Sequence, residues 1–125
     1  MKKIINTISA PKPVGPYNQA IQAGGMLYVS GQLAINPKDN KLAPPDITLQ
    51  THQVMENIKA ILEAAQYTLE DVVQTTVFLS SMTLFEEFNN EYAKYLKNEA
   101  PARATVAAEL KSGALVEVSA VAYKE

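Results

Sequence analysis

Two β-strands joined by a short turn are expected in PARATVAAELKSGALVEVSAVAY, residues 101–123. Each strand carries one charged residue where a sheet favours neutral side chains. Arg103 lies in a run of small apolar residues, and Glu117 lies between Val116 and Val118. A guanidinium or a carboxylate on an apolar strand is costly to desolvate unless it has a partner. Arg103 and Glu117 are therefore the first candidates for a functional site.

Side-chain alternation gives the expected sheet two different faces. Alternation along the first strand puts Arg103, Thr105 and Ala107 on one side. We expect Ala107 to share the face that helices leave uncovered with Val121 and Tyr123. Such a face is too apolar for solvent, and an exposed apolar face usually marks an interface. The chain is therefore expected to form a homo-oligomer.

The two charged residues are far apart if the two strands pair with each other. If residues 102–110 and 115–123 form a simple hairpin, Arg103 and Glu117 are separated by roughly 15 Å, at about 3.3 Å per residue. Two explanations stay open. Each charge forms a salt bridge elsewhere in its own chain, or Arg103 of one chain faces Glu117 of another across a small cavity. The expected apolar interface favours the second explanation.

Two amphipathic helices are predicted outside this region. Residues 47–65 carry apolar side chains at spacings of three and four, and Asp46 is a suitable N-cap. Thr83 and Glu86 have the spacing of a capping box, which predicts a second helix that ends near Lys97.

Strands account for much of the remaining chain. The expected strands are residues 3–8, 20–22, 26–30 and 72–79, in addition to the two strands described above. Gly24 and Gly25 predict a hairpin turn, and the β-branched residues 72–79 predict a central strand. The order β-β-β-helix-β-helix-β-β indicates an α+β fold, with one mixed sheet and two helices packed on one face.

The composition is that of an ordinary globular protein. The 125 residues, 47% hydrophobic and 19% charged, predict one domain, residues 1–125. A net charge of −2 gives no reason to expect a nucleic acid or a membrane as partner. Because the chain has no cysteine and one histidine, His52, no metal site built from cysteine or histidine is expected. No membrane span and no signal sequence are recognisable, so a cytoplasmic protein is expected.

Several neutral residues could line a pocket near the two charges. Tyr17 follows three prolines that stiffen the chain, and it could form a pocket wall or remain an ordinary tyrosine at the edge of the core. Ser30 and Gly31 could offer backbone groups to a ligand, although a glycine at a strand bend is common. Asn89 lies between Phe88 and Asn90 on the second amphipathic helix, as a polar residue at the boundary of its apolar face. An arginine fork suits a small carboxylate, and a glutamate can orient water or transfer a proton.

Six segments together resemble the RidA/YjgF family of small trimeric imine deaminases, also described as L-PSP-type endoribonucleases. They are PVGPYNQAI, LYVSGQLAINP, QTHQVMENIKAILEAA, LEDVVQTTVFL, FEEFNNEYAKYL and PARATVAAELKSGALVEVSAVA. The last segment is the most specific, with Pro101, Arg103, Leu110, Gly113 and Glu117 at the expected positions. The resemblance covers nearly the whole chain. It implies a chorismate-mutase-like α+β fold and a homotrimer with three clefts between subunits.

The resemblance also implies a cofactor-free activity. This activity is the hydrolysis of 2-imino acids such as 2-iminobutanoate and 2-iminopropanoate, which dehydratases dependent on pyridoxal phosphate release, to 2-keto acids and ammonia. Arg103 takes the place of the arginine that binds the substrate carboxylate, and Glu117 takes the place of the glutamate that handles water. The remaining cleft positions correspond to Tyr17, Ser30, Gly31 and Asn89. Thr105 stands where many members have cysteine, and a hydroxyl can bind a ligand but cannot replace a thiolate.

Two other functions stay open. A non-catalytic regulatory trimer could bind a keto acid or an amino acid in the same cleft, and binding without turnover would favour it. An endoribonuclease is the other alternative. The pI of about 5.4 and the lack of a basic aromatic patch argue against the endoribonuclease.

Overall fold

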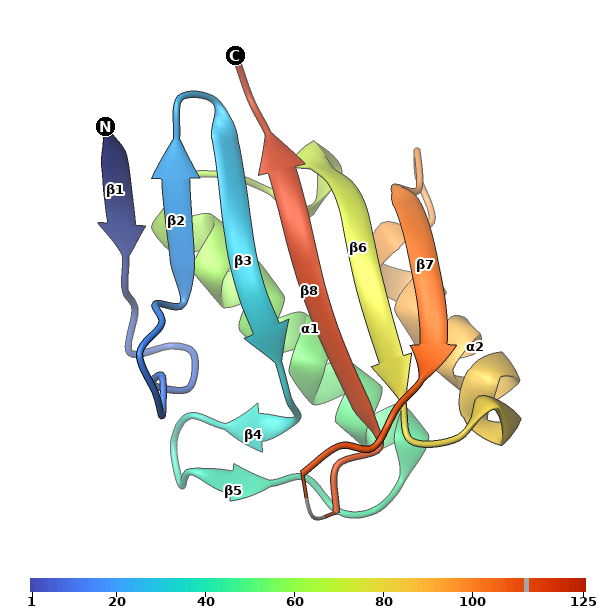
Figure 1. Cartoon of the computed structure of the whole chain (residues 1–125). Helices are drawn as coiled ribbons and strands as arrows, with labels where there is room; N and C mark the ends of the chain where they lie inside the picture. The colour runs from blue at the N-terminus through green and yellow to red at the C-terminus, as the bar shows by residue number, and fades with distance from the viewer. Residues whose placement is uncertain (112) are drawn as a thin grey trace.

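A six-stranded mixed sheet forms the centre of the computed structural model, which describes residues 1–111 and 113–125. The strand order across the sheet is β1-β2-β3-β8-β6-β7 (Figure 1). The strands in this order span Lys2–Ile5, Ala20–Ala23, Met26–Gln32, Val116–Tyr123, Val72–Leu79 and Ala102–Ala107. Neighbouring strands are antiparallel except β6 and β7, which run parallel. Two short strands that the sequence did not predict, β4 (Ile35–Asn36) and β5 (Lys41–Leu42), form a separate two-stranded sheet.

Both helices lie on the same face of the large sheet, behind it in the view of Figure 1. Helix α1 spans Ile47–Ala64 and helix α2 spans Phe85–Leu96. The Asp46 side chain caps α1 by accepting a hydrogen bond of 3.0 Å from the backbone N–H of Leu49. Apolar side chains of the helices and of the covered face form the core. The predicted α+β fold is therefore confirmed. In the described part of the chain, neither helix has the length and apolar character that crossing a membrane requires.

The start of α2 differs from the prediction. Residues Met82–Leu84 form a 3₁₀ helix, and the Ser81 hydroxyl caps it by accepting a hydrogen bond of 3.2 Å from the backbone N–H of Thr83. Helix α2 then begins at Phe85 without a side-chain cap. The predicted capping box of Thr83 and Glu86 is absent because the cap belongs to the preceding turn.

The last two strands do not form the predicted hairpin of residues 102–110 and 115–123. Strand β6 lies between them, parallel to β7 and antiparallel to β8. The connection of residues 108–115 is longer than the two to five residues of a hairpin loop. Moreover, β6, α2 and β7 form a strand–helix–strand unit, whose strands can pair in parallel because the helix supplies the crossover.

The two faces of the sheet carry different residues. On β8 the residues toward the helices are Val116, Val118, Ala120 and Ala122, and those on the uncovered face are Glu117, Ser119, Val121 and Tyr123. The prediction for Val121 and Tyr123 is confirmed. The prediction for β7 is wrong, because Arg103 is opposite the buried Thr75 of β6, so that Arg103, Thr105 and Ala107 lie on the helix-covered face. An edge strand of small residues shows too little alternation to reveal its covered side.

Candidate functional site

The Glu117 carboxylate lies beside an irregularity in β3. The pairing of β3 with β8 shifts between Val29 and Gln32, so that Ser30 and Gly31 form a β-bulge. A Cβ atom on Gly31 would lie 3.0 Å from the Glu117 Cδ and 3.1 Å from its Oε2. Glycine therefore lets the carboxylate approach the bulge closely, and bulges beside functional sites commonly direct a side chain in this way.

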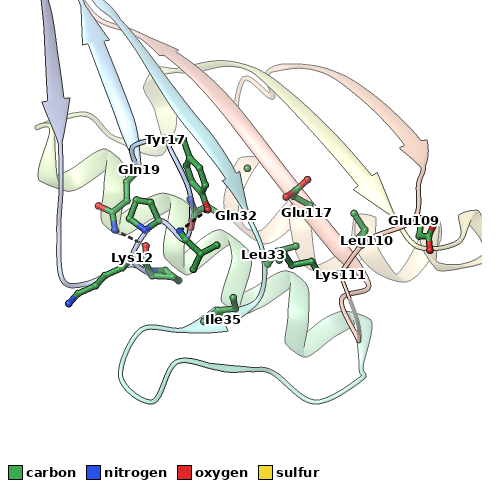
Figure 2. A pocket seen from close by; sticks show the side chains of 14 residues that line it. Lys12, Tyr17, Gln19, Gln32, Leu33, Ile35, Glu109, Leu110, Lys111 and Glu117 are labelled. Atoms are coloured by element: carbon green, nitrogen blue, oxygen red, sulfur yellow. Dashed lines mark hydrogen bonds between the residues drawn. The ribbon is translucent and has the colours of Figure 1, made fainter.

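A cavity of about 310 Å³ opens next to this carboxylate (Figure 2). Tyr17, Gly31 and Glu117 line the cavity, and Ser30 lines a neighbouring hollow together with the same three residues. The Tyr17 hydroxyl accepts a hydrogen bond of 3.3 Å from the backbone N–H of Val14, which ties the ring to the proline-rich segment. Tyr17, Ser30, Gly31 and Glu117 are called the Glu117 group below.

Gln19 fixes one wall of the cavity, and it was not predicted from the sequence. Its Oε1 accepts a hydrogen bond of 2.7 Å from the backbone N–H of Thr7. Its Nε2 donates to the carbonyl oxygens of Thr7, Ala10 and Pro11 at distances between 2.9 and 3.2 Å. Gln19 is only 2% exposed, so this network both satisfies a buried amide and holds the proline-rich wall in place. All its partners are backbone atoms, which leave no signal in a sequence.

Arg103 lies on the other side of the sheet, against α2. Its guanidinium carbon is 5.0 Å from the ring centroid of Tyr92 and 5.6 Å from those of Phe85 and Phe88. Neither salt bridge found among the described residues involves Arg103. Because aromatic faces hold a cation without occupying its N–H donors, the guanidinium remains available to an anion.

Asn89 and Thr105 accompany Arg103. Asn89 shares one side of α2 with Phe85, four residues earlier, and Thr105 shares one side of β7 with Arg103. The Asn89 Oδ1 and the Thr105 Oγ1 are buried and have no hydrogen-bond partner among the described residues. An unpartnered buried oxygen is costly, and a ligand could supply the missing donor. Arg103, Thr105 and Asn89 are called the Arg103 group below.

One chain does not bring the two groups together. Phe78 of β6 is level with Glu117 on one side and with Val106 on the other. Arg103 therefore lies three residues along and two strands across from Glu117, a separation of about 14 Å at about 3.3 Å per residue and 4.8 Å per strand. The two side chains also point to opposite faces. A single reaction centre that uses both charges requires two chains.

Two tyrosines of α2 have raised pKa values. Burial raises the pKa of Tyr92, while its hydrogen bond to Thr75 and the positive charge of Arg103 oppose this increase. Burial also raises the pKa of Tyr95, and the hydrogen bond to the Glu56 carboxylate acts in the same direction. Both tyrosines are therefore neutral near pH 7.

The single histidine lies outside both groups. The His52 side chain is 55% exposed, and its Nδ1 is 2.7 Å from the Tyr95 hydroxyl oxygen. In residues 1–111 and 113–125, no cluster of three or more histidine, aspartate or glutamate side chains is suited to hold a metal ion.

The fold agrees with the comparisons with known proteins. Residues 7–124 match the sequence model of the family described as Endoribonuclease L-PSP. The chain belongs to this family, the RidA/YjgF family that its sequence segments resemble.

The similarity to other proteins extends over nearly the whole length of both chains. A RutC family protein of Pyrococcus horikoshii is 50% identical over 126 residues, which cover 100% of each chain. The solved structure of YyfA from Yersinia pestis, described as a protein of unknown function of the conserved Rid family, has 43% identity and a TM-score of 0.96, covering 99% of this chain and 100% of YyfA. RidA from the Antarctic bacterium Psychrobacter sp. has 39% identity and a TM-score of 0.94, covering 98% of this chain and 99% of RidA.

Proposed function

We propose that this chain is a cofactor-free deaminase that hydrolyses 2-imino acids, such as 2-iminobutanoate and 2-iminopropanoate, to 2-keto acids and ammonia. The observation that carries the proposal is the set of contacts that the Arg103 guanidinium makes. Its guanidinium is held by three aromatic rings and has no carboxylate partner among the described residues. Its planar fork can donate two parallel hydrogen bonds to the carboxylate that every 2-imino acid carries. Membership of the RidA/YjgF family supports the same reaction.

The proposed assembly is a homotrimer with a cleft between each pair of subunits. The Arg103 group and the Glu117 group face opposite sides of one sheet, so a complete site needs the Arg103 group of one subunit and the Glu117 group of the next. The uncovered face offers an apolar surface for this contact, with Tyr28, Val106 and Tyr123 exposed on it. A closed ring of three identical contacts gives three equal clefts.

In this cleft Arg103 binds the substrate carboxylate and thereby fixes the position of the imine carbon, C2. Glu117 orients a water molecule and takes its proton as the water oxygen bonds to C2. That proton then passes to the nitrogen of the resulting carbinolamine. Glu117 takes the proton of the carbinolamine hydroxyl as the C–N bond breaks, so that the C=O bond of the 2-keto acid forms and ammonia leaves. One water is consumed and no electrons are transferred, so the reaction needs no cofactor. Because imines hydrolyse spontaneously in water, orientation and charge placement are sufficient for a useful acceleration.

The other members of the two groups shape the cleft. The free oxygens of Asn89 and Thr105 can accept hydrogen bonds from the imine nitrogen or from water. Tyr17 and Ser30 form walls beside Glu117, and Gly31 leaves room for its carboxylate. Release of imines by cytoplasmic dehydratases would make the cytoplasm the site of action.

A coupled assay tests the proposal. A threonine dehydratase generates 2-iminobutanoate, semicarbazide competes for the imine, and the appearance of 2-ketobutanoate is followed over time. We expect the wild-type protein to accelerate keto-acid release and Arg103→Ala to leave the rate at the level of the blank. Lys59→Ala is the matched control, because it removes a cation from the exposed side of α1. Its activity should equal that of the wild type.

A different result would favour the regulatory alternative. If the wild type binds 2-ketobutanoate but does not exceed the blank, the deaminase proposal is wrong and a ligand-sensing trimer takes its place. Acceleration by Arg103→Ala equal to that of the wild type would contradict the role of the arginine.

A further inference from the structure

A buried pair of hydroxyl groups lies beside Arg103. The hydroxyl oxygens of Tyr92 and Thr75 are 2.7 Å apart and form a hydrogen bond. Thr75 is 1% exposed and Tyr92 is 6% exposed. The Tyr92 ring is also the aromatic ring nearest to the guanidinium, with 5.0 Å between its centroid and the guanidinium carbon. Neither hydroxyl belongs to the groups described above.

Three elements meet at this point. Thr75 of β6 and Arg103 of β7 are directly opposite each other in the parallel pair, so their side chains leave the sheet side by side. Tyr92 comes from α2 and reaches both of them. Its ring lies against the Arg103 guanidinium, and its hydroxyl pairs with Thr75 and also faces Arg103. The hydrogen bond to Thr75 therefore fixes the ring on which the guanidinium rests.

Packing alone does not explain the pair. The next two side chains of β6 on the same face, Val77 and Leu79, are apolar and completely buried. On α2, the completely buried Phe88 packs against Tyr92, with 5.2 Å between the ring centroids. A valine and a phenylalanine would fill nearly the volume of Thr75 and Tyr92 without burying two hydroxyl groups. Burying such groups is costly, and pairing them offsets the cost without adding to the packing.

We infer that Tyr92, held by Thr75, is a positioning residue that orients the Arg103 guanidinium for a substrate carboxylate. The inference rests on the proposed function of Arg103 as the carboxylate-binding group. The arginine side chain is long and rotates about several bonds, and no carboxylate among the described residues fixes it. A ring locked in place by a buried hydrogen bond limits those rotations before the ligand arrives, which lowers the ordering cost of binding. Tyr92 and Thr75 act through Arg103 and do not touch the reacting atoms.

A double-mutant cycle separates positioning from packing. Tyr92→Phe and Thr75→Val each leave one buried hydroxyl without its partner and should lower thermal stability. The double variant removes both hydroxyls and should recover most of the wild-type stability. The readout for Arg103 is the dissociation constant of 2-ketobutanoate, measured by titration calorimetry. Tyr95→Phe is the matched control, because its hydroxyl lies on the same helix but donates to Glu56.

If Tyr92 and Thr75 orient the Arg103 guanidinium, the stable double variant should bind 2-ketobutanoate at least about tenfold more weakly than the wild type, because small displacements of a binding group are costly. The Tyr95→Phe control should bind with wild-type affinity. Thr75→Ser keeps the hydroxyl and should also retain the affinity, so the comparison of Thr75→Ser with Thr75→Val remains decisive if the double variant does not fold.

A stable double variant with wild-type affinity, or a wild type that does not bind the carboxylate, would overturn the inference. If the wild type binds 2-ketobutanoate but hydrolyses no imine, the deaminase proposal fails while the cycle still measures the orientation of Arg103. The two failures are therefore distinguishable.

Discussion

The positive charge of Arg103 is held by the faces of three aromatic rings. A carboxylate partner would hold the guanidinium more firmly, but it would also occupy the N–H donors and neutralise the charge. Aromatic faces attract the cation while leaving the donors at the guanidinium edge free. The surroundings of Arg103 therefore suit an arginine that binds a ligand better than one that stabilises the fold.

Substitution of this arginine by lysine tests the need for a planar fork. Arg103→Lys keeps the charge but loses the paired donors and the flat surface that stacks on the rings. We expect kcat/KM in the coupled assay to fall at least about tenfold, with little change in the melting temperature. A lysine variant with wild-type kcat/KM would show that charge alone is sufficient.

Alanine substitutions at two glycines should affect different properties, activity at Gly31 and stability at Gly24. A Cβ at Gly31 would lie 3.0 to 3.2 Å from three side-chain atoms of Glu117, so Gly31→Ala must displace the carboxylate and should reduce activity. A Cβ at Gly24 would contact nothing within 4 Å, but Gly24 has a φ of +60°. Gly24→Ala should therefore leave activity unchanged and cost about 1 kcal/mol of stability. Denaturant unfolding and the coupled assay measure both effects, and equal loss of activity in the two variants would contradict this account of Gly31.

At the scale of elements, β6 sets the arrangement of both groups. It forms hydrogen bonds with β7, which carries Arg103, and with β8, which carries Glu117. The sequence predicted each of these strands and both long helices, because their apolar periodicities are regular. It did not predict the pairing, since a hairpin of consecutive strands and a crossover around β6 use the same local patterns. The length of the connection of residues 108–115 was the available signal.

Helices α1 and α2 are joined by polar groups near the surface. The Tyr95 hydroxyl of α2 donates a hydrogen bond of 2.8 Å to the Glu56 carboxylate of α1, and His52 Nδ1 lies 2.7 Å from the same hydroxyl. Only a neutral tyrosine can donate this hydrogen bond. The contact therefore depends on the protonation of Tyr95.

Alkaline pH should weaken this contact. Burial and the Glu56 carboxylate raise the pKa of Tyr95 above its ordinary value of 10.0, so above that pH the unfolded chain loses the proton while the folded protein keeps it. The stabilisation is complete below about pH 10 and is lost as the pH rises through the folded-state pKa. We expect the melting temperature to fall less steeply above about pH 10 in Tyr95→Phe than in the wild type. Part of the decrease in melting temperature should remain in Tyr95→Phe, because burial also raises the pKa of Tyr92. Identical slopes in the variant and the wild type would contradict the prediction.

At the scale of the whole molecule, the candidate site was only partly predictable. Charge on apolar strands was sufficient to single out Arg103 and Glu117. The assignment of Arg103 to the uncovered face was wrong, because β7 is an edge strand of small residues with little alternation. Gln19 and Tyr92 left no signal, since they act through backbone groups or look like ordinary core residues. In the proposed function the two groups meet only between subunits, so neither the sequence nor the structure of one chain contains that contact.

The Arg103 group and the Glu117 group face opposite sides of the sheet, so the proposed trimer must bring opposite sheet faces of two subunits together. Arg103 is on the helix-covered face and Glu117 is on the uncovered face of the same sheet. If the proposed trimer is correct, each cleft takes its arginine from one subunit and its glutamate from the next. Two inactive variants should then complement each other.

Mixing Arg103→Ala and Glu117→Gln subunits is the most direct test of this claim. The variants are unfolded together, refolded in equal amounts and assayed for imine hydrolysis, with the Arg103→Ala/Glu117→Gln double variant replacing one partner as the control. In trimers assembled at random from the two variants, half of the subunits keep Arg103 and the other half keep Glu117. About one quarter of the clefts therefore carry both residues. We predict that each variant alone is inactive and that the mixture recovers about one quarter of the wild-type activity. A mixture as inactive as its two components would contradict a site shared between subunits.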